Sequence, residues 1–319
     1  MGKLFSKILV TGGAGFIGSH LVDRLLAEDY EVVILDNFSQ GRLSNISDNE
    51  NKNLKIFRGD IQKISEIKAA FRDVDAVFHE AAMVSVVQSI QNPILANEIN
   101  VNGTLNVLKA SADFNVKRLV FASSAAVYGP NSGACKNEDS IAIPVNPYGV
   151  TKLVGEKYVR LFNDLYGIEA VSLRYFNIYG PKQSFDINSG YGGVITLFLN
   201  RLLQNLSPII YGDGNQTRDF VHVKDIVNAN MLALESKKLS GDFFNIGSGV
   251  SISVKEVAQI LKDLLNKRHL KNTYKEQRLG EEKHGFADIN KAKSKLNYEP
   301  KVNFREGIAD LINWYINKS

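Results

Sequence analysis

The first half of the chain alternates short apolar runs with longer segments in which apolar residues recur at helical spacing. Several runs are almost wholly apolar, which is typical of strands buried on both faces of a parallel sheet. The predicted strands are "KILVT" (7–11), "EVVILD" (31–36), "LKIFRG" (54–59), "AVFH" (76–79), "RLVFAS" (118–123) and "EAVSLRY" (169–175). The predicted helices lie near 15–28, 63–72, 93–114 and 148–166. This order predicts an α/β fold with a doubly wound parallel sheet and right-handed crossovers.

The pattern changes after about residue 180, where longer polar loops that contain glycine separate the apolar segments. A late apolar run, "DFFNIGS" (242–248), resembles one more strand that rejoins the first sheet. We therefore expect a first domain over residues 1–180 and a smaller C-terminal lobe over 181–319. The chain is expected to cross back to the first domain near 220–248.

Composition narrows the class of protein. The 319 residues are 44% hydrophobic and 23% charged, which is ordinary for a globular protein, and the net charge of +4 is too small to indicate nucleic-acid binding. The single cysteine, Cys135, cannot form an intramolecular disulfide and suits a reducing compartment. No apolar run is long enough to span a membrane, and the five histidines show no metal-ligand spacing. We expect a cytoplasmic protein without a metal, nucleic-acid or membrane partner.

A glycine-rich segment follows the first predicted strand directly, in "KILVTGGAGFIGSHL" (7–21). Gly13, Gly15 and Gly18 fit the pattern G-x-G-x-x-G, whereas Gly12, Gly15 and Gly18 fit G-x-x-G-x-x-G. Glycines let a backbone approach a pyrophosphate closely, and the following helix N-terminus offers free N–H groups and a positive dipole end. The segment predicts a dinucleotide site, in one of two registers.

Two acidic positions support that site and favour one cofactor. Asp36 ends the second predicted strand, where a carboxylate can accept hydrogen bonds from an adenosine ribose. No arginine follows Asp36 immediately, so a ribose 2′-phosphate would meet a like charge, and NAD is favoured over NADP. Asp60 and Ile61 follow the third predicted strand and are expected to border the adenine.

The stretch "VNPYGVTKL" (145–153) contains the residues that indicate catalysis. Asn146 is a good N-cap and Pro147 suits a first helical position, so that Tyr148 and Lys152 share one face of the predicted helix. A phenol titrates at about pH 10, but a nearby ammonium and the positive charge of an oxidised nicotinamide favour the phenolate. Tyr148 can then exchange a proton with a sugar hydroxyl, and Ser124, at the end of a central strand, can bind the same hydroxyl.

Together these residues resemble the extended short-chain dehydrogenase/reductase family, and within it the branch of UDP-glucose (UDP-galactose) 4-epimerases. The resemblance covers essentially the whole chain. The matching motifs are "TGGAGFIGSHL" (11–21), "NVNGTLNVL" (100–108), "SSAAVYG" (123–129), "YGVTK" (148–152), "RYFNIYGP" (174–181), "YGDGNQTRDFVHVKDIV" (211–227), "FNIGSG" (244–249) and "DINKAKSKL" (288–296).

The resemblance implies a Rossmann-type NAD-binding domain, a smaller lobe that binds a UDP-sugar, and roles for individual residues. It makes Tyr148, Lys152 and Ser124 catalytic, and it selects the glycine register of Gly12, Gly15 and Gly18. The NAD site is implied to comprise Gly12, Gly15, Phe16, Ile17, Gly18, Asp36, Asn37, Asp60, Ile61, Asn100, Tyr148, Lys152 and Tyr175. The substrate site is implied to comprise Ser124, Asn177, Val194, Tyr211, Arg218, Arg278, Glu281 and Gly285.

Two positions discriminate between members of the family. Related dehydratases and decarboxylases carry an acid two residues after the catalytic hydroxyl residue, where this chain has Ala126, so elimination of water lacks a reactive group. Seven residues after Arg278, Gly285 stands where small residues admit an N-acetyl group on the sugar and bulky ones exclude it. By contrast Val84 replaces a lysine of the galactose-type bacterial enzymes, which leaves the sugar preference open.

Three other functions stay open at this point. They are a catalytically silent NAD-binding protein, a dehydrogenase that releases an oxidised sugar, and an epimerase of UDP-uronic acids, which would need a further cation near the sugar C6. The predicted function is the NAD-dependent C4 epimerisation of a UDP-hexose, including N-acetylated ones. A homodimer is implied by the resemblance, with the helices near 93–114 and 148–166 in contact.

Overall fold

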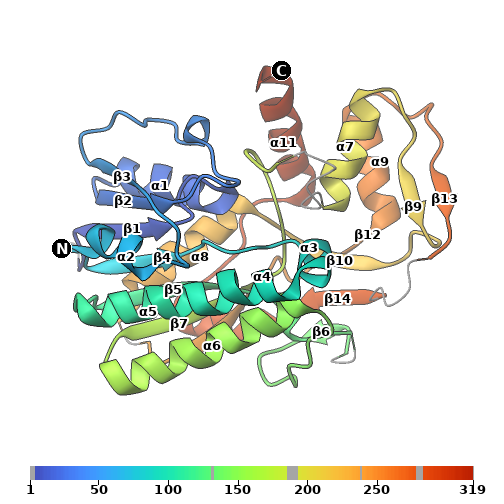
Figure 1. The fold of residues 1–319 in the computed structure, drawn as a ribbon. Helices are drawn as coiled ribbons and strands as arrows, with labels where there is room; N and C mark the ends of the chain where they lie inside the picture. The colour runs from blue at the N-terminus through green and yellow to red at the C-terminus, as the bar shows by residue number, and fades with distance from the viewer. Residues whose placement is uncertain (1–3, 131–132, 185–192, 238, 278–282, 319) are drawn as a thin grey trace.

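The computed structural model describes residues 4–130, 133–184, 193–237, 239–277 and 283–318. Its centre is a seven-stranded parallel sheet with the strand order β11-β7-β5-β4-β1-β2-β3 (Figure 1). The strands are β1 (Lys7–Thr11), β2 (Glu31–Asp36), β3 (Leu54–Arg58), β4 (Ala76–His79), β5 (Arg118–Ser124), β7 (Glu169–Tyr175) and β11 (Asp242–Ile246). The predicted doubly wound α/β fold is confirmed. From β1 the strand order runs to one side through β2 and β3, and from β4 it runs to the other side through β5, β7 and β11. In such sheets ligands bind at the carboxyl ends of the strands, beside the point where the order changes direction, here between β1 and β4.

Helices cover both faces of this sheet because successive strand residues point to opposite sides. On β1, Ile8 and Val10 pack in one apolar core, while Leu9 between them packs in the other. The first core is covered by α1 (Phe16–Ala27), α8 (Val223–Glu235) and α10 (Asn290–Leu296). The second core is covered by α2 (Ile64–Ile67), a 3₁₀ turn (Lys68–Phe71), α5 (Gly103–Asp113) and α6 (Pro147–Tyr166). Strands β1, β2, β4, β5 and β7 are buried on both faces over most of their length, as their apolar sequences predicted, whereas the edge strand β3 exposes Lys55 and Arg58.

The segment predicted as one helix near 93–114 is three elements. It runs through α4 (Pro93–Asn97), a π-helical turn (Glu98–Asn102) and α5. The turn carries Asn100, whose side-chain amide accepts a hydrogen bond from Met83 N at 2.8 Å and donates one to Met83 O at 2.9 Å. Inserted π turns often mark functional positions. Here the turn fixes the loop after β4, which forms part of the cavity described below.

The C-terminal lobe has its own apolar core, a five-stranded mixed sheet and a separate two-stranded sheet. Its core lies between α7 (Val194–Leu203), α9 (Val254–Leu264) and α11 (Phe304–Lys318). Its strands are β6 (Cys135–Lys136), β8 (Asn177–Tyr179), β9 (Ile209–Tyr211), β10 (Thr217–His222), β12 (Ser251–Ser253), β13 (Thr273–Lys275) and β14 (His284–Ala287). The remaining short elements are α3 (Val86–Gln91) and 3₁₀ turns at Leu43–Asn45 and Ala125–Val127. Because β6 pairs with β14, the first half of the chain contributes a strand to this lobe.

A buried ion pair joins helix α6 to strand β7 under the catalytic edge. Arg174 donates to both carboxylate oxygens of Glu156, Nε to Oε1 at 2.8 Å and Nη2 to Oε2 at 2.7 Å. Both side chains are buried. Glu156 also accepts a hydrogen bond from Ser123, which places the pair directly behind the residues predicted to be catalytic.

Replacing Arg174 tests that connection. We expect Arg174→Met to lower the free energy of unfolding by about 3–5 kcal/mol, because the Glu156 charge is left buried without its partner. Urea denaturation measures the loss. The matched control is Arg24→Met, which breaks the exposed Arg24–Glu28 pair and is expected to cost less than about 1 kcal/mol. Equal losses for the two variants would show that the buried pair does not stabilise the fold more than a surface pair.

Candidate active site

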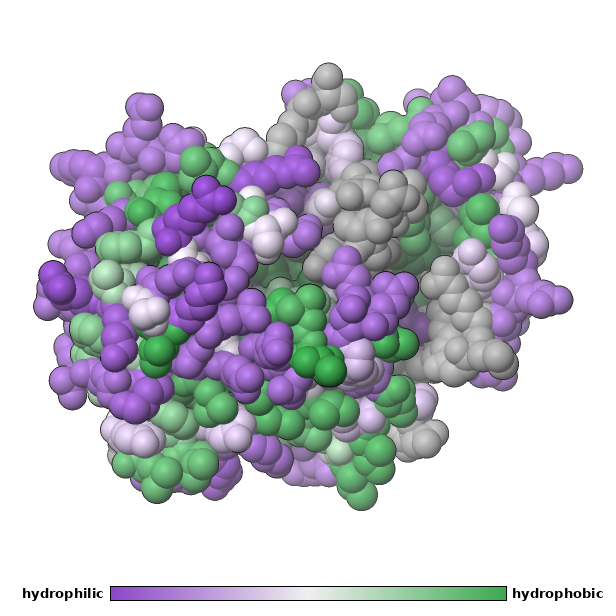
Figure 2. Space-filling view, in the orientation of Figure 1, coloured by the Kyte–Doolittle hydropathy of each residue, from purple (hydrophilic) through white to green (hydrophobic). Residues whose placement is uncertain are grey.

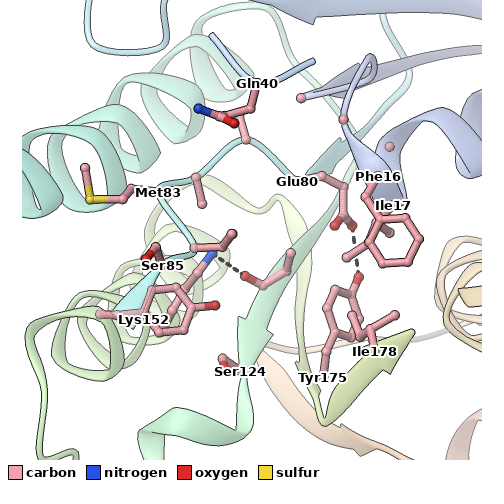
Figure 3. A pocket seen from close by; sticks show the side chains of 18 of the residues that line it. Phe16, Ile17, Gln40, Glu80, Met83, Ser85, Ser124, Lys152, Tyr175 and Ile178 are labelled. Atoms are coloured by element: carbon pink, nitrogen blue, oxygen red, sulfur yellow. Dashed lines mark hydrogen bonds between the residues drawn. The ribbon is translucent and has the colours of Figure 1, made fainter. Parts of the chain in front are cut away.

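A cavity of about 1380 Å³ lies along the carboxyl edge of the large sheet and is closed on its far side by the C-terminal lobe (Figure 3). This volume exceeds the range of about 300–1,000 Å³ that ordinary small-molecule sites occupy, and it suits two extended ligands in one space. Sixteen of the residues implied by the resemblance line it: Gly12, Gly15, Phe16, Ile17, Gly18, Asp36, Asn37, Asp60, Ile61, Ser124, Tyr148, Lys152, Tyr175, Asn177, Arg218 and Gly285.

The glycine segment forms a tight turn between β1 and α1. Gly12 adopts φ +68°, and a Cβ there would lie 2.8 Å from the backbone nitrogen of Ala81. A Cβ on Gly18 would lie 2.2 Å from the carbonyl oxygen of Gly12. Gly13 instead packs against Ile34 of β2 and is absent from the cavity lining, whereas Gly12, Gly15 and Gly18 belong to it. The geometry therefore favours the G-x-x-G-x-x-G register, with a bare backbone at the N-terminus of α1 that fits a pyrophosphate.

The cavity wall beside the glycine turn is formed by residues at the ends of β2 and β3. Asp36 is buried, and its carboxylate accepts hydrogen bonds from Ala14 N at 3.0 Å and Phe38 N at 2.7 Å. Burial raises its pKa above the ordinary value despite those bonds. Asn37 donates to Asp60 at 3.1 Å. Although burial opposes the change, hydrogen bonds from Gln62 and Asn37 lower the pKa of Asp60. An ionised carboxylate pair beside the glycine turn suits the hydroxyls of a ribose and disfavours a phosphate on it.

Helix α6 positions the catalytic pair. Asn146 is its N-cap, accepting a hydrogen bond from Gly149 N at 2.8 Å, and Pro147 is its first residue, as predicted. A Cβ on Gly149 would lie 2.4 Å from the carbonyl of Ala126, so glycine lets the helix start against the turn that follows β5. That close approach brings Tyr148 beside Ser124 and directs both side chains into the cavity.

The environment of Tyr148 differs from the sequence prediction in one respect. We expected Lys152, together with an oxidised nicotinamide, to lower the pKa of the phenol. In the protein chain itself burial raises the pKa of Tyr148 to about 12, and a hydrogen bond with Ser124 opposes the rise only in part. The Lys152 ammonium lies 5.9 Å from the phenol ring centre and donates to the carbonyl of Ala122 at 2.8 Å. The lysine alone therefore does not make Tyr148 a base.

A carboxylate that the sequence analysis did not single out lies in the same space. Glu80 follows β4 and accepts a hydrogen bond from the hydroxyl of Tyr175 at 2.9 Å (Figure 3). Burial raises the pKa of Glu80 to about 7, and Lys152 opposes that rise. Burial likewise lowers the pKa of Lys152 to about 8, which Glu80 and Glu156 oppose. In the sequence, the position of Glu80 directly after a predicted central strand was the only sign that it could lie in the site.

On the side of the C-terminal lobe the cavity carries polar groups from three strands. Asn177 donates to the carbonyl of Asp219 at 2.8 Å, and Arg218 lies in register with Gly285 across the β10–β14 pair. Five implied residues are not among the described residues that line the cavity. Asn100, Val194 and Tyr211 are described but do not line the cavity, and the Asn100 amide is occupied by Met83. Arg278 and Glu281 lie outside the described residues.

Comparison with known proteins identifies the family. The model of the NAD dependent epimerase/dehydratase family matches residues 8–247. The chain belongs to this family. A UDP-glucose 4-epimerase of Mycolicibacterium smegmatis is 34% identical over 98% of this chain and 99% of its own.

Two solved structures show the same overall architecture with different sugars. A UDP-N-acetylglucosamine 4-epimerase from Methanobrevibacter ruminantium, in complex with UDP-N-acetylmuramic acid, is 36% identical with a TM-score of 0.93 over 99% of both chains. A variant of UDP-glucuronic acid 4-epimerase from Bacillus cereus, in complex with a fluorinated UDP-glucuronic acid and NAD, is 33% identical with a TM-score of 0.89. It covers 98% of this chain and 100% of its own.

The predicted family, cofactor and enzyme class are confirmed by these matches. The protein is an NAD-dependent enzyme of the epimerase type, and the glycine turn with Asp36 fits that cofactor by its geometry. No helix in the described part of the chain is both long and apolar enough to cross a membrane.

The preference for NAD over NADP rests on the Asp36 charge. We expect Asp36→Asn to weaken NAD binding and to improve the affinity for NADP relative to NAD by on the order of tenfold. The substitution removes the negative charge that repels the 2′-phosphate of NADP, and it leaves one oxygen that can accept from Ala14 N or Phe38 N. Calorimetric titration of both dinucleotides measures the ratio. An unchanged NADP-to-NAD ratio in the variant would contradict the role of this carboxylate.

Proposed function

We propose that the protein interconverts UDP-hexoses that differ in configuration at C4, including N-acetylated ones, through a transient 4-keto sugar. The observation that carries the proposal is that Ser124, Tyr148 and Lys152 meet in one cavity, between the glycine turn and the C-terminal lobe, and that Ala126, two residues after Ser124, lines the same cavity. That set can oxidise and re-reduce an alcohol but has alanine where related dehydratases carry their acid.

The chain's own residues handle the proton and the position of the sugar. Bound NAD would supply reversible hydride transfer at the sugar C4. Tyr148 takes the proton of the O4 hydroxyl, and the Ser124 hydroxyl binds the same oxygen. Lys152 holds a positive charge near the phenol, and the positive nicotinamide adds the charge that Lys152 alone does not supply.

Inversion at C4 requires the sugar to turn over while the nucleotide stays bound. We assign the diphosphate to Asn177, Arg218 and Arg278, because guanidinium groups match phosphate oxygens. Tyr211 is assigned to the uracil face, Glu281 to the uridine ribose and Val194 to the same substrate lobe. A firm grip on the UDP and a sugar pocket with few contacts allow the 4-keto sugar to present either face.

The sugar class is argued from two cavity residues. Gly285 on β14 leaves room beside the sugar, which supports N-acetylhexosamines alongside plain hexoses. Lys136 on the neighbouring strand β6 also lines the cavity, and its ammonium donates to the carbonyl of Gly129 at 3.2 Å. A cation at this end would suit a uronic acid, so a UDP-uronic acid 4-epimerase is the second candidate.

We also propose a homodimer. Exposed apolar side chains gather over α3, α4 and α6 (Figure 2). They include Ile94 and Leu95 on α4 and Leu161 and Leu165 on α6. Such a patch is larger than isolated surface apolar residues and is typical of a protein–protein contact.

The product decides between these candidates. We expect purified protein without added cofactor to convert UDP-N-acetylglucosamine and UDP-glucose to their C4 epimers, and UDP-glucuronate more slowly, with NMR identifying each product. Tyr148→Phe should lower turnover at least about 100-fold, since proton transfer typically contributes that much, while leaving NAD bound. Release of a 4-keto sugar as the main product would indicate a dehydrogenase. Loss of NAD in Tyr148→Phe would contradict the role given to the phenol.

The space beside Gly285 is tested by filling it. We expect Gly285→Tyr to lower kcat/KM for UDP-N-acetylglucosamine on the order of 10–100-fold more than for UDP-glucose, because only the first sugar has a bulky C2 group. Gly285→Ala is the matched control and should change both values little. If Gly285→Tyr affected both sugars equally, the position would not select at C2.

A further inference from the structure

Glu80 is placed at the centre of the catalytic edge. It directly follows β4, and its backbone packs against the glycine turn, since a Cβ on Gly12 would lie 3.1 Å from the Glu80 carbonyl carbon. Its side chain points into the cavity toward Tyr175, which ends β7 (Figure 3). The carboxylate therefore lies between the pyrophosphate turn and the group formed by Tyr148 and Lys152.

A chain of hydrogen bonds fixes this carboxylate. The side-chain amide of Asn230, on α8, donates to the Tyr175 oxygen at 2.8 Å and to the carbonyl of Ile226 at 2.9 Å. The Tyr175 hydroxyl in turn donates to Glu80 Oε1 at 2.9 Å. The Tyr175 hydroxyl has two acceptors within reach, Glu80 Oε1 at 2.9 Å and Asn230 Oδ1 at 3.1 Å, and the carboxylate is the nearer and the more strongly accepting of the two. Glu80 is thus held as an acceptor, which favours its ionised form.

The groups that face Glu80 come from three elements of the described chain. Tyr175 lies on β7, Tyr148 and Lys152 lie on α6, and the neutral amide of Asn230 stands behind Tyr175. The charge of Glu80 raises the pKa of Lys152, and it raises those of both tyrosines. Glu80 and Lys152 form an electrostatically coupled pair of opposite charges in a poorly solvated space, where such coupling is strong.

Neither proton transfer nor sugar binding uses Glu80 in the scheme above. Its negative charge instead distinguishes the two states of the cofactor, because an oxidised nicotinamide ring is positive and a reduced one is neutral. A fixed carboxylate near the ring favours the positive state, and nearby charge is one of the means by which a protein tunes a cofactor. Lys152 acts in the opposite direction, so the balance depends on whether Glu80 is ionised.

We propose that the negative charge of Glu80 biases the bound nicotinamide toward its oxidised form. This bias favours the return of the 4-keto sugar to an alcohol before the sugar is released. Glu80 is therefore a positioning residue, which acts through the cofactor and not on the sugar. This inference rests on the proposed function, because the cofactor must be reduced and reoxidised within one turnover. It concerns the equilibrium between those two states and not the identity of the sugar. The sugar would lose a hydride from C4 to the cofactor and the O4 hydroxyl proton to Tyr148, and both would return in the second half.

The test measures the reduced cofactor directly. Holoenzyme is mixed at about pH 8 with saturating UDP-glucose or UDP-N-acetylglucosamine, and the near-ultraviolet absorbance of the reduced ring is read at equilibrium. We expect Glu80→Gln, which keeps an acceptor for the Tyr175 hydroxyl, to raise the reduced fraction on the order of tenfold. Glu138→Gln is the matched control. It removes a half-buried carboxylate that accepts a hydrogen bond from Asn245 N at 2.8 Å and does not line the cavity, and it should leave the reduced fraction at the wild-type value.

A pH series on the wild-type protein gives an independent measurement that needs no variant to fold. Lowering the pH from about 8 to about 6 protonates Glu80 and should raise the reduced fraction in the wild type and Glu138→Gln, whereas Glu80→Gln should not respond. Equal reduced fractions in wild type and Glu80→Gln at about pH 8, or the same pH response in both, would overturn the inference. Failure of the wild type to form an epimer by NMR would instead count against the proposed function.

Discussion

The catalytic edge depends on how the protein keeps a lysine charged inside it. Lys152 is only 3% exposed, and burying an ammonium is costly unless opposite charges and hydrogen bonds compensate. The compensation comes from the carbonyl of Ala122 on β5, from Glu156 behind it and from Glu80 in front. The three partners belong to different elements, namely β5, α6 and the segment after β4. The Lys152 charge is therefore stabilised only when these strands are adjacent and α6 starts at its observed position. Because Glu156 is itself neutralised by Arg174 of β7, the framework and the active site share one electrostatic network.

This network explains why the protein chain alone gives a tyrosine with a high pKa. The same burial that makes electrostatic effects strong penalises the phenolate, and the nearest carboxylate, Glu80, adds to the penalty. In the proposed reaction, Tyr148 would therefore become a base only when additional positive charge arrives beside it. The site is arranged so that the ligand that must be present for the chemistry also supplies the charge for the proton transfer. A free enzyme with a permanently ionised tyrosine would gain nothing from this arrangement.

Local patterns predicted the fold well because parallel strands buried on both faces leave a clear sequence signature. All seven central strands lie within two residues of their predicted bounds, and the N-cap Asn146 and first helical residue Pro147 stand where the sequence placed them. The break in the helix near 93–114 could not be predicted, because the π turn is stabilised by a distant partner, the Met83 backbone that Asn100 binds. Asn100 stays a predicted cofactor contact implied by the resemblance, and its side-chain amide is hydrogen-bonded to the Met83 backbone. Glu80 escaped notice because its significance comes from Tyr175, almost a hundred positions along the chain.

The arrangement of the two lobes bears on how relatives with one framework can differ in the sugar they act on. The glycine turn and the ends of β2 and β3 are parts of a rigid sheet, and they fix the cofactor half of the cavity through backbone geometry. The opposite half consists of the short strands β6, β10 and β14, in which β14 pairs with both of the others. Each strand contributes one cavity residue: Lys136 from β6, Arg218 from β10 and Gly285 from β14. A single substitution on such a short strand changes the sugar pocket without moving the catalytic edge. Relatives that share this framework are named for glucose, N-acetylglucosamine and glucuronic acid derivatives, which is the outcome expected if the chemistry is set by one lobe and the sugar by the other.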